Sequence, residues 1–258
     1  MLEKNTIIFT DLDGTLLDHD SYSFEEASFM LEFIKQNDIP LIIVTSKTKN
    51  EVIRLQKLLG ISTPFIIENG AGICVSRFQD YEMIPLGKDY EEIRRAFKRY
   101  AKKIDMHGFF DMSIAEICEH TGLSQEQAGY AKERDFTEPF ILHDEADVSA
   151  LRDMARKDGL DIVQGGRFYH LITKGQDKAS AIKKVVQQYQ TAKSCRYKTV
   201  GLGDSENDLS MLASVDTPIL IPHPDGSYTP CTIPNLIKAP FAGSKGWNST
   251  LKEYFDVQ

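Results

Sequence analysis

Two aspartates stand two residues apart where an apolar run ends at a glycine, in the segment Ile7-Ile8-Phe9-Thr10-Asp11-Leu12-Asp13-Gly14-Thr15. Alternate side chains of a strand share a face, so Asp11 and Asp13 can point toward one spot beyond the strand end. Gly14 allows the sharp turn that follows. Two anions held this close are unfavourable unless a cation joins them, and all-oxygen ligands suit a hard ion such as Mg²⁺. The pattern is typical of phosphoryl transfer.

Two other interpretations of this segment are a calcium-binding EF-hand loop and a structural Asp-Gly turn. An EF-hand requires Gly at its sixth position and Glu at its twelfth. Counted from Asp11, these positions hold Leu16 and Tyr22, which excludes the EF-hand. A turn in which Asp13 only binds backbone amides fits the segment taken alone.

A second acidic cluster makes the structural turn a poor explanation. Residues 200–203 form an apolar run that leads into Gly203-Asp204-Ser205-Glu206-Asn207-Asp208 and then a helical pattern. The run Gly201-Leu202-Gly203 suggests a dinucleotide-binding loop, but the third glycine of that motif would fall on Glu206. The polar residues of the cluster could merely cap the helix. Both acidic clusters together instead predict one metal site.

The elements that must position these residues alternate between strand and helix. We predict strands at 6–10, 40–45 and 64–68 with helices at 24–36 and 49–59. The same alternation resumes with helix 177–190, strand 197–203, helix 206–214, strand 217–221 and helix 245–255. This predicts an α/β fold: a Rossmann-like core with a parallel sheet, formed by residues 1–82 and 173–258. Active sites in such sheets lie beyond the carboxyl ends of the strands, where Asp11, Thr45 and Asp204 fall.

Residues 83–172 show a different pattern of helices and strands, which predicts an inserted α+β domain. We expect helices at 88–103, 113–121, 124–132 and 147–158, and strands at 138–142, 160–164 and 167–173.

The composition indicates one soluble enzyme. The net charge of −8 argues against nucleic acid or an anionic membrane as partner, and leaves a small molecule. The four cysteines form no C-x-x-C pair, so no zinc knuckle or disulfide framework is indicated. With neither a signal peptide nor a membrane-length apolar run, we expect a cytoplasmic location. The sequence leaves the oligomeric state open.

The chain resembles the haloacid dehalogenase-like (HAD) superfamily of aspartate-nucleophile phosphatases, whose four motifs occur here in order. The resemblance implies that Asp11 is the nucleophile, that Asp13 is the general acid and base, and that Thr45 or Ser46 binds a phosphoryl oxygen. It implies that Lys178 neutralises charge in the site. For Mg²⁺ it implies four ligand residues, namely Asp11, Asp13 through its backbone carbonyl, Asp204 and Asp208.

The insert is similar to the C2 cap of subclass IIB, and four segments resemble the mannosyl-3-phosphoglycerate phosphatase family more closely. These are residues 67–70, 134–140, 165–170 and 243–248. The resemblance implies a sugar-glycerate substrate held by Asn69, Arg134, Glu138, Arg167 and Asn207, with Arg167 on the glycerate carboxylate and Glu138 on sugar hydroxyls. For His170 and Trp247 we expect packing roles. The second motif, Thr45-Ser46-Lys47-Thr48, departs from the Thr-Gly-Arg common in the wider subclass.

Three functions fit these features. The first is Mg²⁺-dependent hydrolysis of mannosyl-3-phosphoglycerate to mannosylglycerate, a compatible solute, through an aspartyl-phosphate; the choice between mannose and glucose stays open. The second is phosphotransfer to another sugar, as in the related phosphomannomutases, or a broader sugar-phosphate phosphatase activity. The third is a non-catalytic sugar-phosphate sensor, against which the complete set of motif residues argues. Phosphate release without an acceptor separates the first from a strict mutase.

Overall fold

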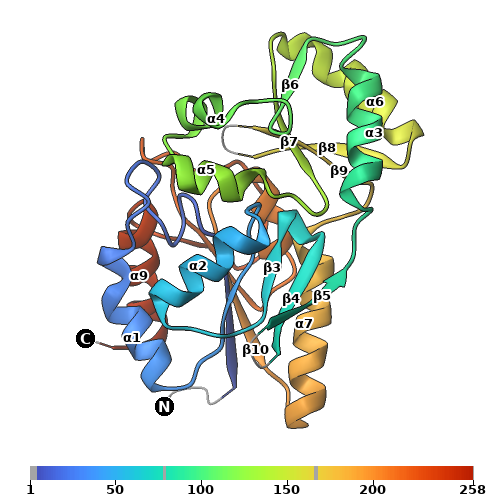
Figure 1. Ribbon diagram of the computed structural model, residues 1–258. Helices are drawn as coiled ribbons and strands as arrows, with labels where there is room; N and C mark the ends of the chain where they lie inside the picture. Colours follow the sequence, from blue (N-terminus) through green and yellow to red (C-terminus); the bar gives the residue numbers. More distant parts are fainter. Residues whose placement is uncertain (1–4, 78–79, 166–167, 258) are drawn as a thin grey trace.

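The computed structural model describes residues 5–77, 80–165 and 168–257 (Figure 1). In this part of the chain, the core is built on a parallel sheet whose strands follow the order β12 (Ile237–Lys238), β11 (Thr217–Leu220), β10 (Lys198–Gly203), β1 (Thr6–Thr10) and β2 (Leu41–Ile43). A parallel bridge between Val44 and Ile66 leads on to β3 (Phe65–Ile67). The predicted parallel core is therefore confirmed.

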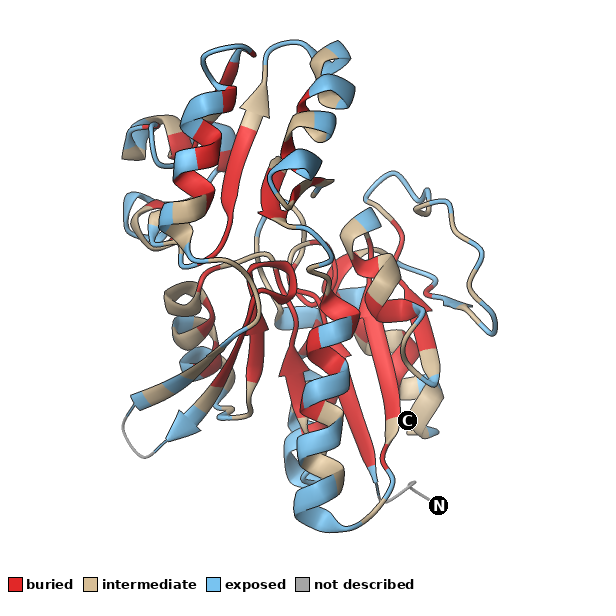
Figure 2. Cartoon of the chain, turned by 90° about the vertical axis from the view of Figure 1, so that its right-hand side faces the viewer, coloured by how far each residue is buried: buried red, intermediate tan, exposed pale blue. Residues whose placement is uncertain are grey.

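Helices cover both faces of this sheet. Helices α1 (Ser28–Gln36), α2 (Lys49–Leu59) and α9 (Gly243–Phe255) share one hydrophobic cluster with Ile8 of β1. Helices α7 (Lys178–Lys193) and α8 (Leu209–Leu212) share the other with Ile7 and Phe9. Successive strand residues point to opposite faces, so a continuous apolar run is buried on both sides. Strands β1 and β2 are accordingly buried along their length, and β10 and β11 are buried except at their first residue, whereas the edge strand β12 is exposed (Figure 2).

An antiparallel hairpin extends the core beside β3. Strands β4 (Gly72–Arg77) and β5 (Asp80–Pro85) follow a tight turn, η2 (Glu68–Gly70), in which all three residues have positive φ. Neither strand is predicted from the sequence. Strand β5 ends at Pro85, beyond the boundary at residue 82 that we expected for the core.

The cap is a four-stranded antiparallel sheet in the order β6 (Met106–Gly108), β7 (Glu138–Leu142), β9 (Tyr169–Thr173) and β8 (Leu160–Gln164). Helices α3 (Tyr90–Tyr100) and α6 (Val148–Lys157) pack on one face of it. Helices α4 (Ile114–Thr121) and α5 (Gln125–Lys132) form a separate cluster between the cap sheet and the core, where α5 lies above α2 (Figure 1). The predicted α+β fold of the insert is confirmed.

The helix expected at 206–214 is shorter than predicted. It consists of a 3₁₀ turn, η4 (Glu206–Asp208), followed by the single turn of α8. A similar 3₁₀ turn, η1 (Glu25–Ala27), opens the first predicted helix, and another, η3 (Glu145–Asp147), precedes α6.

Within the described ranges, the helices lack the length and apolar character needed to cross a bilayer.

Candidate active site

The carboxyl ends of β1 and β10 bring the two acidic motifs together. The strands are parallel neighbours with Thr10 opposite Leu202, so Asp11 and Asp204 emerge side by side at one edge of the sheet. Trp247 of α9 is fully buried and donates its indole N–H to Thr10 Oγ1 at 3.1 Å, which fixes the end of β1 from behind. The expected packing role of Trp247 agrees with this contact.

Three carboxylates form the centre of the site. Asp11, Asp204 and Asp208 are buried, and each offers an oxygen within 4.8 Å of the others. The pKa of Asp11 is raised to about 7, chiefly by burial and then by the nearby Asp208 carboxylate, while Lys178 opposes the shift. Burial also raises the pKa of Asp204 well above its ordinary value, and the neighbouring Asp208 and Asp11 carboxylates act in the same direction. The cluster thus carries more negative charge than its surroundings compensate.

A divalent cation fits this cluster. The ligand atoms are carboxylate oxygens, which hard cations prefer, and Asp204 is oriented by Thr15, whose hydroxyl donates to Asp204 Oδ1 at 2.8 Å. Gly14 has a φ of +78°, and a Cβ there would lie 2.7 Å from Asp204 Oδ2. Glycine is therefore required at this position both for the turn and for the approach of the carboxylate.

Lys178 links the two carboxylates on either side of the site. As the first residue of α7 it is almost fully buried, and its Nζ donates to Asp11 Oδ1 and to Asp208 Oδ1, both at 2.6 Å. Burial opposes the charge of Lys178, but Asp11 and Asp208 outweigh it and raise its pKa. The second oxygen of Asp208 accepts the backbone N–H groups of Asp204 and Ser205, both at 3.1 Å. Asp208 therefore orients both Lys178 and the loop of the fourth motif.

Asp13 lies at the edge of the site and is paired with Lys47, a residue that the sequence analysis did not assign to the site. Lys47 Nζ lies 2.8 Å from Asp13 Oδ2 and 3.7 Å from Glu51 Oε1. Burial disfavours the charge of Lys47, but the two carboxylates outweigh it and raise its pKa. A signal was present in the sequence, since Lys47 directly follows the second-motif hydroxyls.

The two hydroxyl residues of the second motif differ in exposure. Thr45 is buried, and its Oγ1 accepts the backbone N–H of Lys47 at 3.2 Å. Ser46 lines the main cavity. This arrangement favours Ser46 as the group that meets a ligand, and the assignment of either hydroxyl to phosphate stays a prediction.

The site opens into a cavity of about 460 Å³ between core and cap. Both carboxylates of the first motif line it, together with Asp204 and residues of the cap. The cap contributes apolar side chains beside polar ones, in the order Phe109, Thr121, Leu123, Ala131, Arg134, Pro139, Gly165, Phe168 and His170. A concave, partly apolar space of this size suits a small organic molecule.

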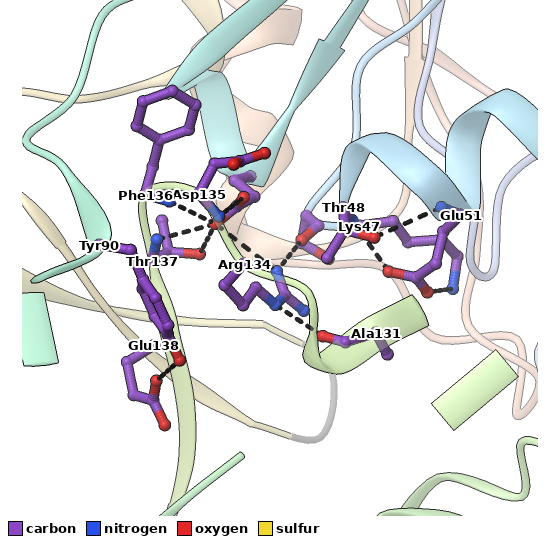
Figure 3. A network of polar contacts seen from close by, with 12 residues as sticks. Lys47, Thr48, Glu51, Tyr90, Ala131, Arg134, Asp135, Phe136, Thr137 and Glu138 are labelled. Atoms are coloured by element: carbon purple, nitrogen blue, oxygen red, sulfur yellow. Dashed lines mark hydrogen bonds and ion pairs between the residues drawn. The ribbon is translucent and has the colours of Figure 1, made fainter. Parts of the chain in front are cut away.

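Arg134 reaches from the cap to the core (Figure 3). Its Nη1 donates to the Ser46 carbonyl oxygen at 2.7 Å, and its Nε donates to the Ala131 carbonyl oxygen at 2.9 Å. Its guanidinium also lies 4.0 Å from the buried carboxylate of Glu68. Arg134 lines the cavity, and its hydrogen bond to the Ser46 carbonyl oxygen holds the second motif in place.

Glu138 lies on the other face of the cap sheet. In β7 it shares the face of Phe140, which is covered by α3, whereas Pro139 faces the cavity. Its carboxylate accepts the Tyr90 hydroxyl and the Phe110 backbone N–H, and it pairs with Arg94 at 3.1 Å. These contacts differ from the expected role on sugar hydroxyls and give Glu138 a function inside the cap.

The other predicted substrate residues are dispersed. Asn207 lines the cavity and donates its Nδ2–H to Asn69 Oδ1 at 3.0 Å, so these two lie together at the core side. Arg167 lies outside the described residues. His170, on the cavity face of β9, is buried, and its Nδ1 has no hydrogen-bond partner within residues 5–77, 80–165 and 168–257. Burial, together with Arg134 and Lys178, lowers its pKa to about 3.

Comparison with known proteins identifies the family. Residues 8–221 match the family model of haloacid dehalogenase-like hydrolases. The chain is 49% identical over 256 residues to a glucosyl-3-phosphoglycerate/mannosyl-3-phosphoglycerate phosphatase of Persephonella marina, with 95% of each chain covered. A phosphatase of the same description from Methanococcoides burtonii is 36% identical, with 96% of each chain covered.

A solved structure that is distant in sequence has a similar fold. A sugar phosphatase described as HAD subclass IIB superimposes with a TM-score of 0.62 at 18% identity, covering 84% of this chain and 87% of the other. The predicted core with an inserted cap agrees with this neighbour. With its motifs in order around one acidic cluster, the chain belongs to the haloacid dehalogenase-like hydrolases.

Proposed function

We propose that this protein is a Mg²⁺-dependent phosphatase that hydrolyses a glycosyl-3-phosphoglycerate, with glucose or mannose as the sugar, to the glycosylglycerate and phosphate. The observation that carries the chemistry is the pairing of buried Asp11 with Lys178 at the floor of a cavity that Asp13 also lines. The substrate class is supported by the two curated relatives, whose names state it.

Asp11 is suited to attack phosphorus. Lys178 binds Oδ1 of Asp11, which leaves Oδ2 as the attacking atom and fixes its direction. An Oδ2–phosphorus bond forms as the bond from phosphorus to the ester oxygen breaks, giving an aspartyl-phosphate. The positive charge of Lys178 stabilises the negative charge on the transferring group. Water then cleaves the aspartyl-phosphate and regenerates the Asp11 carboxylate.

Asp13 is suited to move the protons. It lies two residues beyond Asp11 on the cavity wall, where it can give a proton to the departing ester oxygen and later take one from water. Its Oδ2 contacts Lys47, and its Oδ1 is buried and has no hydrogen-bond partner in the part of the chain that the structure describes. The same residue therefore serves both half-reactions.

Asp11, Asp204 and Asp208 would hold the divalent ion, which we infer to be Mg²⁺ from the all-oxygen ligands. When bound, this ion offsets the repulsion between the anionic nucleophile and the anionic phosphate. We also infer a cytoplasmic location, because all four cysteines are free thiols.

A phosphate-release screen tests the proposal. Purified protein with Mg²⁺ is offered mannosyl- and glucosyl-3-phosphoglycerate, sucrose phosphate, hexose phosphates and phosphoglycolate. We expect the two glycosyl-3-phosphoglycerates to give the highest kcat/KM. A higher value for a hexose phosphate would replace the proposal with a broader sugar phosphatase, and release only in the presence of a sugar acceptor would indicate a mutase.

A further inference from the structure

Lys47 is a cation on the cavity wall that the proposed reaction does not yet use. Its side chain is 15% exposed, and Nζ lies 2.8 Å from Asp13 Oδ2. An ammonium group carries three donor hydrogens. The contact with Glu51 is longer, at 3.7 Å, and the Tyr22 ring centre lies 5.3 Å away. Lys47 therefore has donor capacity beyond its bond to Asp13.

The other permanent cation among the described cavity residues is already engaged. Arg134 donates to two backbone carbonyl oxygens and lies beside the buried Glu68 carboxylate. Figure 3 shows its guanidinium turned toward the segment that contains Thr48. Lys178 is bound between Asp11 and Asp208 beneath the site. A second anionic group on a ligand would therefore find its most available positive charge at Lys47.

The chemistry of the substrate places a second anion near this point. In a 3-phosphoglycerate the ester oxygen is bonded to C3, and only C2 separates C3 from the carboxylate carbon. The ester oxygen must lie within hydrogen-bond reach of Asp13 to receive its proton. The carboxylate is then confined to a small region around Asp13, and Lys47 borders that region.

We propose that Lys47 binds the carboxylate of the leaving group and so selects phosphate esters that carry a carboxylate two carbons from the ester oxygen. This inference rests on the proposed function for its substrate class. Lys47 then has two roles, because the same ammonium group binds the Asp13 carboxylate and the substrate carboxylate that lies beside it. It also differs from the expectation for Arg167, which assigned the carboxylate to the cap.

The test compares two matched substrate pairs in wild type and in Lys47→Met, which keeps length and apolar volume but removes the charge. One pair is mannosyl-3-phosphoglycerate and mannosylglycerol phosphate, which lacks the carboxylate; the other is 3-phosphoglycerate and glycerol 3-phosphate. In Lys47→Met we expect kcat/KM to fall about 10- to 100-fold more on the carboxylate member of each pair, the range of a charge-assisted hydrogen bond. The extra loss should lie mainly in KM, and Lys47→Arg should recover part of it.

Two control variants sharpen the result. Lys57→Met removes a positive charge from an exposed position on α2, the helix that begins two residues after Lys47, and it should leave both pairs unchanged. Arg167→Ala tests the cap alternative directly. A carboxylate-selective loss in Arg167→Ala but not in Lys47→Met would overturn the inference.

Other outcomes separate this inference from the proposed function. Equal losses on both members of a pair would mean that Lys47 acts only through Asp13, which overturns the inference and leaves the function intact. Failure of the wild type on glycosyl-3-phosphoglycerates would reject the proposed function. The smaller pair would then still report whether Lys47 distinguishes a carboxylate.

Discussion

The nucleophile and the buried lysine depend on each other. Without Lys178, the Asp11 carboxylate would sit among Asp204 and Asp208 with little compensation in a dry environment. Without Asp11 and Asp208, a lysine with 1% exposure would lose its charge to desolvation. The two 2.6 Å contacts of Lys178 therefore explain how a carboxylate nucleophile and a lysine ammonium group coexist in the core.

Substitution of the nucleophile gives the first prediction. Asp11→Asn keeps the shape of the side chain but provides a poor nucleophile, so we expect phosphate release to fall to the assay background. The far-UV circular dichroism spectrum should be unchanged. Asp153→Asn, at an exposed position of α6, is the matched control and should keep full activity. Substantial turnover in Asp11→Asn would contradict the covalent mechanism.

His170 supplies a pH-dependent prediction at the same scale. Its pKa is about 3 in the folded protein, against an ordinary value near 6.5 when unfolded. Between these values the unfolded chain binds a proton that the folded chain does not. Unfolding free energy should therefore fall as the pH drops below about 6.5, by about 1.4 kcal/mol per pH unit for this group.

The measurement is urea unfolding of wild type and His170→Gln across this pH range. The stability of the variant relative to wild type should increase as the pH falls. His143→Gln, with a side chain that is 59% exposed, is the control and should show no comparable trend. A constant difference between His170→Gln and wild type would mean that His170 is protonated in the folded state.

At the scale of elements, the η2 turn joins the core to the cap. Glu68 is fully buried with a φ of +48°, and its carboxylate accepts the backbone N–H groups of Asp135 and Thr137 at 2.8 and 2.7 Å. It also accepts the Phe136 N–H and the Thr137 hydroxyl. Burial raises the pKa of Glu68 while Arg134 and these donors oppose the shift. One core side chain thus holds residues 135–137, the cap segment that leads into β7.

Glu68→Ala should therefore destabilise the protein by about 3 kcal/mol or more, because it leaves several buried donors without an acceptor. Hydrogen exchange at the amides of residues 135–137 should accelerate as well. Glu26→Ala, exposed in η1, is the control for loss of a surface carboxylate. Unchanged exchange at 135–137 would show that the cap segment is held by other contacts.

The elements also show what sequence can and cannot predict. The continuous apolar runs of β1 and β10 and the acids that follow them were readable, because a parallel sheet sets both the period and the position of the site. The hairpin β4–β5 was missed although the turn that precedes it contains Asn69-Gly70, a dipeptide typical of tight turns. The family resemblance implied that Glu138 binds sugar hydroxyls, but only the register of β7 tells which face of the cap sheet this side chain occupies. The place of Lys47 in the site could not be predicted, because it depends on the distance between Lys47 and Asp13 in the folded chain.

At the scale of the whole molecule, core and cap enclose an excess of negative charge. The net charge is −8, and Asp11, Asp13 and Asp204 all line the cavity that lies between core and cap. Such enclosure strengthens every charge interaction in the site. It also means that the cation needed for chemistry should contribute to the stability of the folded chain.

Divalent ions should therefore stabilise the protein in a pH-dependent way. The pKa of Asp11 is about 7 and that of Asp204 is also raised, so without metal the folded chain keeps protons that the unfolded chain has released. The contribution of these two carboxyl groups to stability then falls as the pH rises from about 4 through about 7. Because Mg²⁺ competes with these protons, we expect it to raise Tm more at about pH 8 than at about pH 5.

Thermal unfolding with EDTA or with Mg²⁺ at the two pH values checks this expectation. Asp204→Ala should lose most of the Mg²⁺-induced rise in Tm and all Mg²⁺-dependent turnover. Ca²⁺ should also raise Tm, since it binds the same oxygens, but it should inhibit turnover because its longer bonds and looser geometry disturb in-line attack. An Mg²⁺ effect equal at both pH values, or retained in Asp204→Ala, would place the cation away from the cluster of Asp11, Asp204 and Asp208.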